Sequence, residues 1–276
     1  MALFLEPASR ESLAEAGSRL DAHVDGSSAA ELGRLGDDLF AVLCLLLAEV
    51  GIRRHLADPS VPAGARSGLV DTLLAERIGR TALDTVSELA SARWSRSLDF
   101  VDAVETLARR AALAVAEKDG SLDDVEDELF RFGRLLDREP ELNSLLGDGG
   151  TDADKRVGLL RDVLGDRASP VTAGLLEQGV RNPRHRSLDL VAADLAEVAA
   201  ERRDRYVAHV RTAVRLTAAQ EQRLTDTLGR LYQRAISLQI ELDPDLLGGL
   251  VVRVGDELID GSVAGWLVTA RRKLPS

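Results

Sequence analysis

A stripe of apolar side chains recurs every three or four residues along the segment 32–46. This spacing lines one face of an α-helix, because one helical turn takes about 3.6 residues. The stripe consists of Leu32, Leu35, Leu39, Leu43 and Leu46. A second stripe lies ninety residues further on and consists of Leu122, Val125, Leu129, Phe132 and Leu136. The pattern predicts an amphipathic helix in each of two separate parts of the chain.

The two stripes belong to a longer internal repeat. Residues 32–100 align without gaps on residues 122–190 at a constant offset of about 90 residues, which is the length scale of a small domain. Matches among leucines carry little weight, because leucine-rich helices match by chance. The run Arg-Ser-Leu-Asp at 96–99 returns at 186–189, and further polar residues match at the same offset. We therefore infer a duplicated bundle of short helices.

Both copies are predicted to continue with shorter helices after the stripe. Apolar periodicity returns at 66–75 in the first copy and at 156–165 in the second. Ser121 and Asp124 have the spacing of a variant capping box. We therefore expect the side chain of Ser121 to cap the helix that carries the second stripe.

The character of the chain changes after the second copy. Alternating and β-branched residues predict strands, and a Thr-x-x-Gln capping box predicts a helix between them. The expected elements are a connecting helix at 192–205, a strand at 206–216, a helix opened by Thr217 and Gln220, a strand at 236–242, and short strands at 251–254 and 257–259. Gly255 and Asp256 form a two-residue loop that suits a hairpin between the last two strands.

A last helix is expected after Ser262, which has the hydroxyl of a typical N-cap residue. Its apolar face consists of Val263, Trp266, Leu267, Ala270 and Leu274. The predicted fold class is mainly α, with two tandem helical bundles followed by a small α+β C-terminal domain. The predicted domains are an extra N-terminal bundle at 1–107, a second bundle at 108–200 and the α+β domain at 201–276.

Composition excludes several classes of partner. The formal net charge of the 276 residues is −11, which counts against binding to phosphate backbones or anionic lipid headgroups. Cys44 is the only cysteine and lies in the apolar run 40–48, so we expect a buried, unreactive thiol. That run is far shorter than the roughly 20 residues of a membrane-spanning helix, and the first residues lack the pattern of a signal peptide.

No constellation of residues predicts catalysis, a cofactor or a metal site. Gly248 and Gly249 precede a strand and lack the following Lys of a phosphate loop, so a structural role is favoured. The segment 243–254 lacks the ligands required at two positions of a calcium loop, and the four histidines are scattered. Trp94 is interpreted as a core residue. For Trp266, core packing and anchoring of a partner helix remain equally open.

The segment 246–267 carries the most specific signal. It contains two adjacent glycines, a short apolar strand, Gly-Asp, and Ile-Asp-Gly-Ser-Val before the last helix. The signature residues are Gly248, Gly249, Gly255, Asp256, Asp260, Gly261 and Ser262. This pattern resembles the C-terminal end of the δ subunits of F-type ATP synthases, including the mitochondrial oligomycin-sensitivity-conferring protein. The resemblance covers residues 108–276, and the extra segment 1–107 is similar to long δ subunits of high-GC Gram-positive bacteria.

The resemblance implies a non-catalytic stator of the proton-translocating enzyme, without a cofactor. A δ subunit would hold N-terminal helices of α subunits, with β subunits nearby, and would bind the b stalk through its C-terminal domain. Val263, Trp266, Leu267, Ala270 and Leu274 are the candidate contacts with b. Such a subunit would lie peripherally at the cytoplasmic face of the cell membrane. Because no span is evident, the chain resembles free-standing δ rather than forms fused to b.

The extra bundle is expected to add a contact surface, so that removal of residues 1–105 would weaken assembly without unfolding the remainder. The alternative from another class is a helical adaptor or scaffold protein unrelated to energy coupling.

Overall fold

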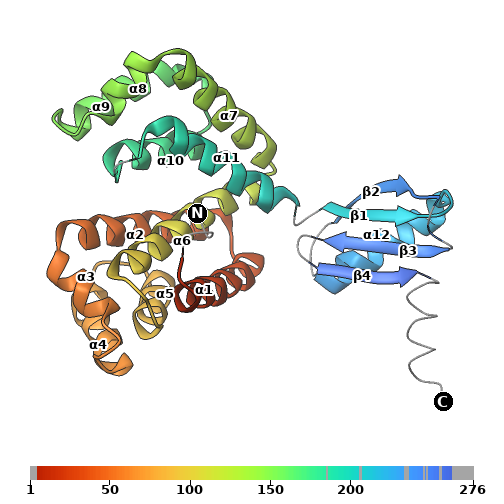
Figure 1. The fold of residues 1–276 in the computed structure, drawn as a ribbon, viewed down its shortest axis with the longest axis horizontal. Coiled ribbons are helices and arrows are strands. Elements are labelled where there is room, and N and C mark those ends of the chain that lie inside the picture. Colours follow the sequence, from red (N-terminus) through yellow and green to blue (C-terminus); the bar gives the residue numbers. More distant parts are fainter. Residues whose placement is uncertain are drawn as a thin grey trace. The chain divides into compact units, whose positions relative to one another are not determined.

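The computed structural model describes residues 5–184, 186–204, 207–232, 236–244, 246, 248–254 and 257–262. The contacts divide the chain into two compact units, Met1–Ala199 and Ala200–Ser276. Helices make up the described part of the first unit, and the second contains a four-stranded sheet and a helix (Figure 1). The predicted fold class, mainly α with a small α+β domain at the C-terminal end, is confirmed.

The first unit is built from two successions of helices. The first consists of α1 (Pro7–Gly26), α2 (Ala29–Ala48), α3 (Val50–Ala57), α4 (Ala63–Leu74), α5 (Arg80–Ser91) and α6 (Ser97–Lys118). The second consists of α7 (Leu122–Arg138), α8 (Pro140–Gly147), α9 (Ala153–Leu164), the short 3₁₀ helix η2 (Gly165–Arg167), α10 (Pro170–Arg181) and α11 (Leu188–Asp204), whose last residues belong to the second unit.

The helix bounds repeat at the offset found in the sequence. α3, α4 and α5 each begin and end ninety residues before α8, α9 and α10. α1 begins ninety residues before α6, and α6 begins 91 residues before α11. α6 is therefore both the last helix of the first bundle and the first helix of the second. The predicted boundary between residues 107 and 108 falls inside α6 and stays a prediction.

Two buried arginines occupy equivalent places in the two bundles. The guanidinium of Arg66 donates to the carbonyl of Leu56 at 3.4 Å and to that of Ala92 at 2.8 Å. Arg156 donates to the carbonyl of Leu146 at 3.1 Å and to the last turn of α10 at 2.5 Å. The carbonyls at a helix C-terminus lack partners within their own helix. Each arginine therefore joins the ends of two helices in its bundle.

A carboxylate holds the start of the fifth helix in each bundle. The backbone N–H of Gly79, before α5, donates to Asp38 on α2 at 2.8 Å. Ninety residues later, the N–H of Ser169 donates to Glu128 on α7 at 2.9 Å. Amide groups at a helix N-terminus favour a negative charge. The duplication thus extends to individual polar contacts.

α2 and α6 pack closely, and Gly36 faces the backbone of α6. A Cβ atom at Gly36 would lie 3.5 Å from the backbone nitrogen of Ala112 and 3.7 Å from the carbonyl oxygen of Ala108. α2 buries eight of its 20 residues, whereas α7 buries a single stripe of five. A continuous apolar core extends from α1 to α11. It includes Trp94, whose indole N–H donates to the Leu89 carbonyl at 2.7 Å, so the predicted core role of Trp94 is confirmed.

Two sequence-based expectations about the helices are wrong. Cys44 is exposed, because it lies on the one stripe of α2 that the core leaves uncovered, between Ala41 and Ala48. The side chain of Ser121 makes no capping hydrogen bond to α7. Its N–H donates back to the carbonyl of Ala116 at 2.8 Å, which closes the end of α6 in the manner of a Schellman motif.

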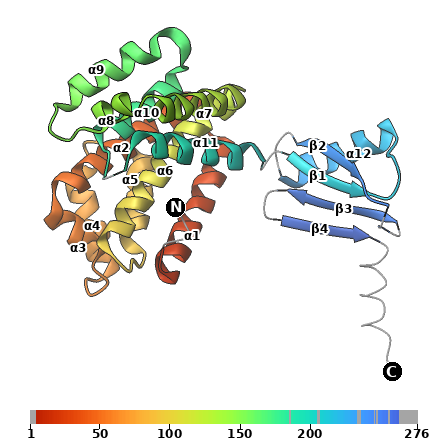
Figure 2. The same ribbon diagram turned by 45° about the horizontal axis from the view of Figure 1, so that its top comes forward.

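The second unit contains a mixed sheet covered by one helix. Its elements are β1 (Val207–Thr212), α12 (Ala218–Tyr232), β2 (Ser237–Leu242), β3 (Gly249–Val254) and β4 (Glu257–Ser262). The strand order is β2-β1-β3-β4, with β1 and β2 parallel and the other pairs antiparallel. α12 packs across one face of the sheet and contributes Leu228 to a small core (Figure 2). The Thr217 capping box is confirmed: its N–H donates to the Gln220 side chain at 2.8 Å.

Candidate interaction surfaces

The C-terminal signature lies in and beside the β3–β4 hairpin. Gly248 and Gly249 have φ values of 141° and 80°, a region that is strained for residues with a Cβ atom. They turn the chain into β3. Gly255 and Asp256 lie outside the described residues, but Val254 pairs directly with Glu257 across the hairpin. The predicted two-residue connection is therefore consistent with the strand register.

Asp260, Gly261 and Ser262 belong to β4, which runs three residues further than the strand predicted at 257–259. Asp260 pairs with Val251 and Gly261 pairs with Leu250. A Cβ atom at Gly261 would lie 3.2 Å from the Leu250 carbonyl oxygen, so the glycine permits a close approach of two backbones. These placements indicate a structural role for the glycines of the signature.

The candidate contacts with the b stalk lie outside the described residues. These are Val263, Trp266, Leu267, Ala270 and Leu274. The expected helix that Ser262 would cap lies in the same segment. Both assignments stay predictions, as does the choice between the two interpretations of Trp266.

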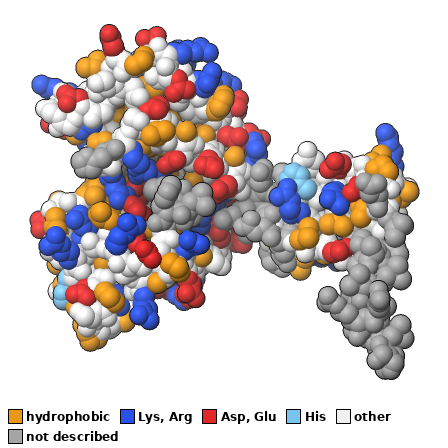
Figure 3. Space-filling model, viewed as in Figure 1, with side chains coloured by type: hydrophobic (Ala, Val, Ile, Leu, Met, Phe, Trp, Pro, Cys, Tyr) orange, Lys and Arg blue, Asp and Glu red, His pale blue; other side chains and the backbone are white. Residues whose placement is uncertain are grey.

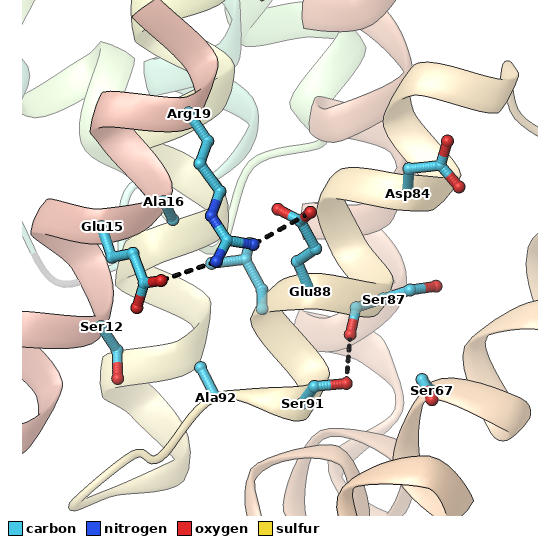
Figure 4. Close-up of a pocket in the computed structure, with 11 residues that line it drawn as sticks. Ser12, Glu15, Ala16, Arg19, Ser67, Asp84, Ser87, Glu88, Ser91 and Ala92 are labelled. Carbon is cyan, nitrogen blue, oxygen red and sulfur yellow. Dashed lines mark hydrogen bonds and ion pairs between the residues drawn. The ribbon is translucent and has the colours of Figure 1, made fainter. Parts of the chain in front are cut away.

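A groove of about 560 Å³ lies between α1 and α5 in the first bundle (Figure 4). Ala16 and Ala92 contribute apolar surface to it, and serine hydroxyls line much of the remainder. The Oγ atom of Ser87 is buried there and has no hydrogen-bond partner among the described residues. This groove forms between helices that are far apart in the sequence, so no local pattern indicates it.

Arg19 crosses one side of this groove from α1. Its guanidinium lies 2.6 Å from Glu15 on the same helix and 3.0 Å from Glu88 on α5 (Figure 4). Hydrogen bonds to Glu88 and Glu15 raise the pKa of Arg19 above its ordinary value. All three side chains are about half exposed, and exposed ion pairs of this kind contribute little to stability. A binding partner can therefore displace them at low cost.

The equivalent positions of the second bundle are buried. Glu105 and Arg109 on α6 stand ninety residues after Glu15 and Arg19, and they are only 3% and 8% exposed. Glu105 accepts hydrogen bonds from Arg109, from Arg184 and from Arg186, the last at 2.8 and 3.0 Å. Arg184 and Arg186 come from the connection between α10 and α11. This connection covers one side of α6, whereas the equivalent side of α1, its counterpart in the first bundle, is exposed.

Glu105 and the three arginines that bind it form a buried cluster, the Glu105 cluster, in which opposite charges lie side by side. Burial by itself would raise the pKa of Glu105, but Arg109, Arg186 and Arg184 more than offset it and hold the pKa below its ordinary value. Arg184 also lies 2.5 Å from Asp102, and Arg186 lies 3.4 Å from Asp194. A buried carboxylate is stable only where such partners satisfy it. The cluster is a structural joint between α6 and the second bundle.

No group of three or more potential ligands that could hold a metal ion occurs within the described residues. Across the same part of the chain, no helix combines the length and the apolar character that crossing a membrane requires.

Comparison with known proteins identifies the family. Residues 108–274 match the family described as ATP synthase delta (OSCP) subunit. The "ATP synthase subunit delta" of Streptomyces avermitilis is 47% identical over 269 residues, covering 98% of both chains. That of Acidothermus cellulolyticus is 44% identical over 276 residues, covering 99% of this chain and 100% of the relative.

A longer relative carries a further segment. The "ATP synthase subunit b-delta" of a Mycobacterium species is 43% identical over 97% of this chain, which spans 60% of that protein. A chain of the Toxoplasma gondii mitochondrial ATP synthase hexamer aligns with a TM-score of 0.35 and 22% identity, a likeness too low to support an assignment. The similarity to long actinobacterial relatives confirms the resemblance found in the sequence. This chain belongs to the ATP synthase delta (OSCP) subunit family.

Proposed function

We propose that this chain serves as the δ subunit in the peripheral stalk of a proton-translocating F-type ATP synthase. It is a non-catalytic connector that links the catalytic head to the b stalk and resists the torque of rotation. The observation that carries the proposal is the similarity, over nearly the whole chain, to proteins named ATP synthase subunit delta. A helical adaptor outside energy coupling is not favoured, because it would leave this similarity unexplained.

The packing of the first unit supports a mechanical role. A stator transmits force, so any soft joint within it would dissipate the load. The two bundles share α6 and one continuous core, and the buried Glu105 cluster ties α6 to the α10–α11 connection. Close-packed interiors have low compressibility. The arrangement therefore suits a rigid link between two partners.

The groove between α1 and α5 is our candidate for contact with the catalytic head. It would take an amphipathic N-terminal helix of an α subunit, with β subunits nearby, in the manner of a helix laid into a bundle groove. Ala16 and Ala92 offer apolar surface to such a helix, and Arg19 and Glu88 offer charges. In the second bundle the corresponding side of α6 is buried, which leaves the first bundle as the candidate for this contact.

The C-terminal unit is our candidate for contact with the b stalk, through the face formed by Val263, Trp266, Leu267, Ala270 and Leu274. Attachment to b would hold the chain peripherally at the cytoplasmic face of the cell membrane.

Copurification tests the proposed function. A tag on the β subunit should recover this chain together with α and b. Ser87→Trp should fill the groove and lower recovery of the chain with an α3β3 head by about tenfold or more, since truncating or blocking a central contact costs at least about 1.4 kcal/mol. Ser18→Trp, on an exposed face of α1, is the matched control and should bind normally. Failure of the unmodified chain to copurify with any of these subunits would reject the function.

A further inference from the structure

A second groove, of about 710 Å³, lies on the outer side of the second bundle. It is formed by the C-terminal half of α7 and by the segment from the end of α9 to the start of α10. Phe130 is 61% exposed and Leu135 is 37% exposed, and both line this groove. Val163 and Leu164 extend the apolar surface. A phenylalanine this exposed is unusual, since aromatic side chains bury a large apolar area when they pack.

Basic side chains surround this apolar surface. The groove is lined by Arg131, Arg134, Arg138 and Arg167, with Glu128 as the one acidic residue. Figure 3 shows basic side chains gathered at the end of α7 that leads into α8, near the top of the view. The whole chain carries a net charge of −11, so the groove has the opposite sign to the chain. The surface therefore favours an acidic partner.

The three arginines on α7 are only weakly engaged within the chain, whereas Arg167 donates to the carbonyl of Val163 at 2.9 Å. Arg131 pairs with Asp127 at 2.7 Å, and both side chains are more than 60% exposed. Arg134 lies 3.8 Å from Asp137, at the outer limit of an ion pair. The guanidinium of Arg138 makes no hydrogen bond or ion pair within the described part of the chain. Because exposed pairs are weak, an incoming carboxylate can compete for these guanidinium groups.

Folding of the bundle does not require this surface. Ninety residues earlier, the positions of Arg131, Arg134 and Arg138 carry uncharged side chains. They are Ala41, Cys44 and Ala48. Phe40, the counterpart of Phe130, is only 6% exposed. The first bundle thus forms the same helix without the basic rim and with its phenylalanine buried. The combination on α7 is a feature of the second bundle alone.

We propose that this groove binds an amphipathic helix of a partner protein in which acidic residues flank the apolar face. Phe130 and Leu135 lie about 7.5 Å apart along the axis of α7, which is close to the rise of about 6 Å between apolar residues at i and i+4 of a partner helix. Arginine forms bidentate hydrogen bonds with carboxylates, and arginine and aromatic residues are enriched at interfaces. This groove and the α1–α5 groove are formed by different helices, so one chain can bind two partner helices at once.

A designed peptide tests the proposal on the isolated full chain. The probe is a labelled 20-residue helix with leucines at three- and four-residue spacing and glutamates beside them, and its twin carries lysines instead. Fluorescence anisotropy should give about tenfold tighter binding for the glutamate peptide than for its twin. Phe130→Ala should weaken binding of the glutamate peptide by about tenfold, and the double variant Arg134→Glu/Arg138→Glu should remove the preference for the glutamate peptide. Leu145→Ala, which removes a leucine that is 57% exposed on α8, should retain it.

A photo-crosslinker at position 130 tests the same groove in the assembled enzyme. The crosslinked segment should be an acidic amphipathic helix of another subunit, and a crosslinker at Leu145 should yield about tenfold less product. Equal binding of the two peptides, or binding that survives the groove variants, would overturn the proposal. So would a crosslink to a basic segment or to a second copy of this chain. If the chain does not copurify with ATP synthase subunits, the proposed function fails, and the peptide measurement still decides this inference.

Discussion

Arg66 and Arg156, ninety residues apart, donate hydrogen bonds to equivalent helix ends in the two bundles. Each guanidinium is buried in its own bundle and donates to a carbonyl ten residues before it and to a carbonyl at the C-terminal end of the helix that follows. Both side chains are almost fully buried, at 3% and 6% exposure. A charge buried in this way is tolerated because three or more carbonyl groups accept its protons.

Replacing Arg66 by methionine should lower the free energy of unfolding by about 2–4 kcal/mol, because hydrogen bonds to a charged group are lost and buried carbonyls are left without partners. Urea denaturation followed by circular dichroism measures the change. Arg54→Met, on the exposed surface of α3, is the control and should change stability by less than about 0.5 kcal/mol. Equal effects of the two variants would contradict the role assigned to Arg66.

Glu105→Gln should destabilise the chain by about 3–5 kcal/mol, because it leaves buried arginines without their central carboxylate. Glu15→Gln provides a matched control, since Glu15 stands at the equivalent position of the first bundle and its side chain is 64% exposed. Guanidinium chloride denaturation should separate the two variants by several kcal/mol. A Glu105 variant as stable as the Glu15 variant would rule out a structural joint at this position.

The effect of Glu105 should depend on pH. The pKa of Glu105 is lower in the folded chain than its ordinary value of 4.5. The stabilisation is therefore complete at pH values above 4.5 and is lost as the pH falls through the lower pKa of the folded state. The stability difference between the unmodified chain and Glu105→Gln should be constant near neutral pH and should shrink below the ordinary value. A difference that grows on acidification would contradict the direction of the shift.

Gly36→Leu should destabilise the contact between α2 and α6 by about 1–3 kcal/mol, because the added side chain meets backbone atoms of α6. Gly36→Ala makes only ordinary van der Waals contacts, and the higher helix propensity of alanine should offset much of their cost. Gly68→Leu on α4 serves as the control, because a Cβ atom at Gly68 meets nothing within 4 Å. Thermal unfolding of the three variants should place only Gly36→Leu clearly below the unmodified chain.

Removal of the first bundle should lower the stability of the remaining chain, whereas the sequence predicted that the remainder would stay folded. Residues 1–105 include the first turns of α6, and α6 buries residues on most of its surface against both bundles. Even a fragment that keeps α6, residues 97–276, would expose the face that packs on α2. We expect this fragment to bind a hydrophobic dye and to unfold at a lower urea concentration than the full chain. A fragment that retains the full stability of the α7–α11 bundle would show that α6 needs only one neighbour.

Much of the architecture follows from local patterns in the sequence. The leucine stripes, the Thr217 capping box and the alternation at 236–242 each depend on neighbours within a few residues, and each predicted element is present. Cys44 was misjudged because an apolar run does not reveal which stripe of a helix stays outside. The prediction for Ser121 was wrong because this residue closes the end of α6, although a serine at this position also suits the start of α7.

The candidate surfaces were harder to foresee. The α1–α5 groove and the Glu105 cluster join residues from distant segments, and only the fold brings them together. One signal was present in the sequence: Glu15 and Arg19 return as Glu105 and Arg109 at the repeat offset. The pattern repeats the ion pair but does not indicate that one copy is exposed and the other buried. That difference depends on the connection carrying Arg184 and Arg186.

Because neighbouring bundles share a helix, the shared α6 determines how many residues a further bundle would add. Because the first helix of the second bundle is already the last helix of the first, a further copy requires five new helices and about ninety residues, with no linker. The boundary between neighbours is then a continuous hydrogen-bonded helix of 22 residues, about 33 Å long. Melting of either bundle removes packing from the helix that the other depends on. The pair should therefore unfold as one cooperative unit, in the way that neighbouring repeats of a solenoid protect one another.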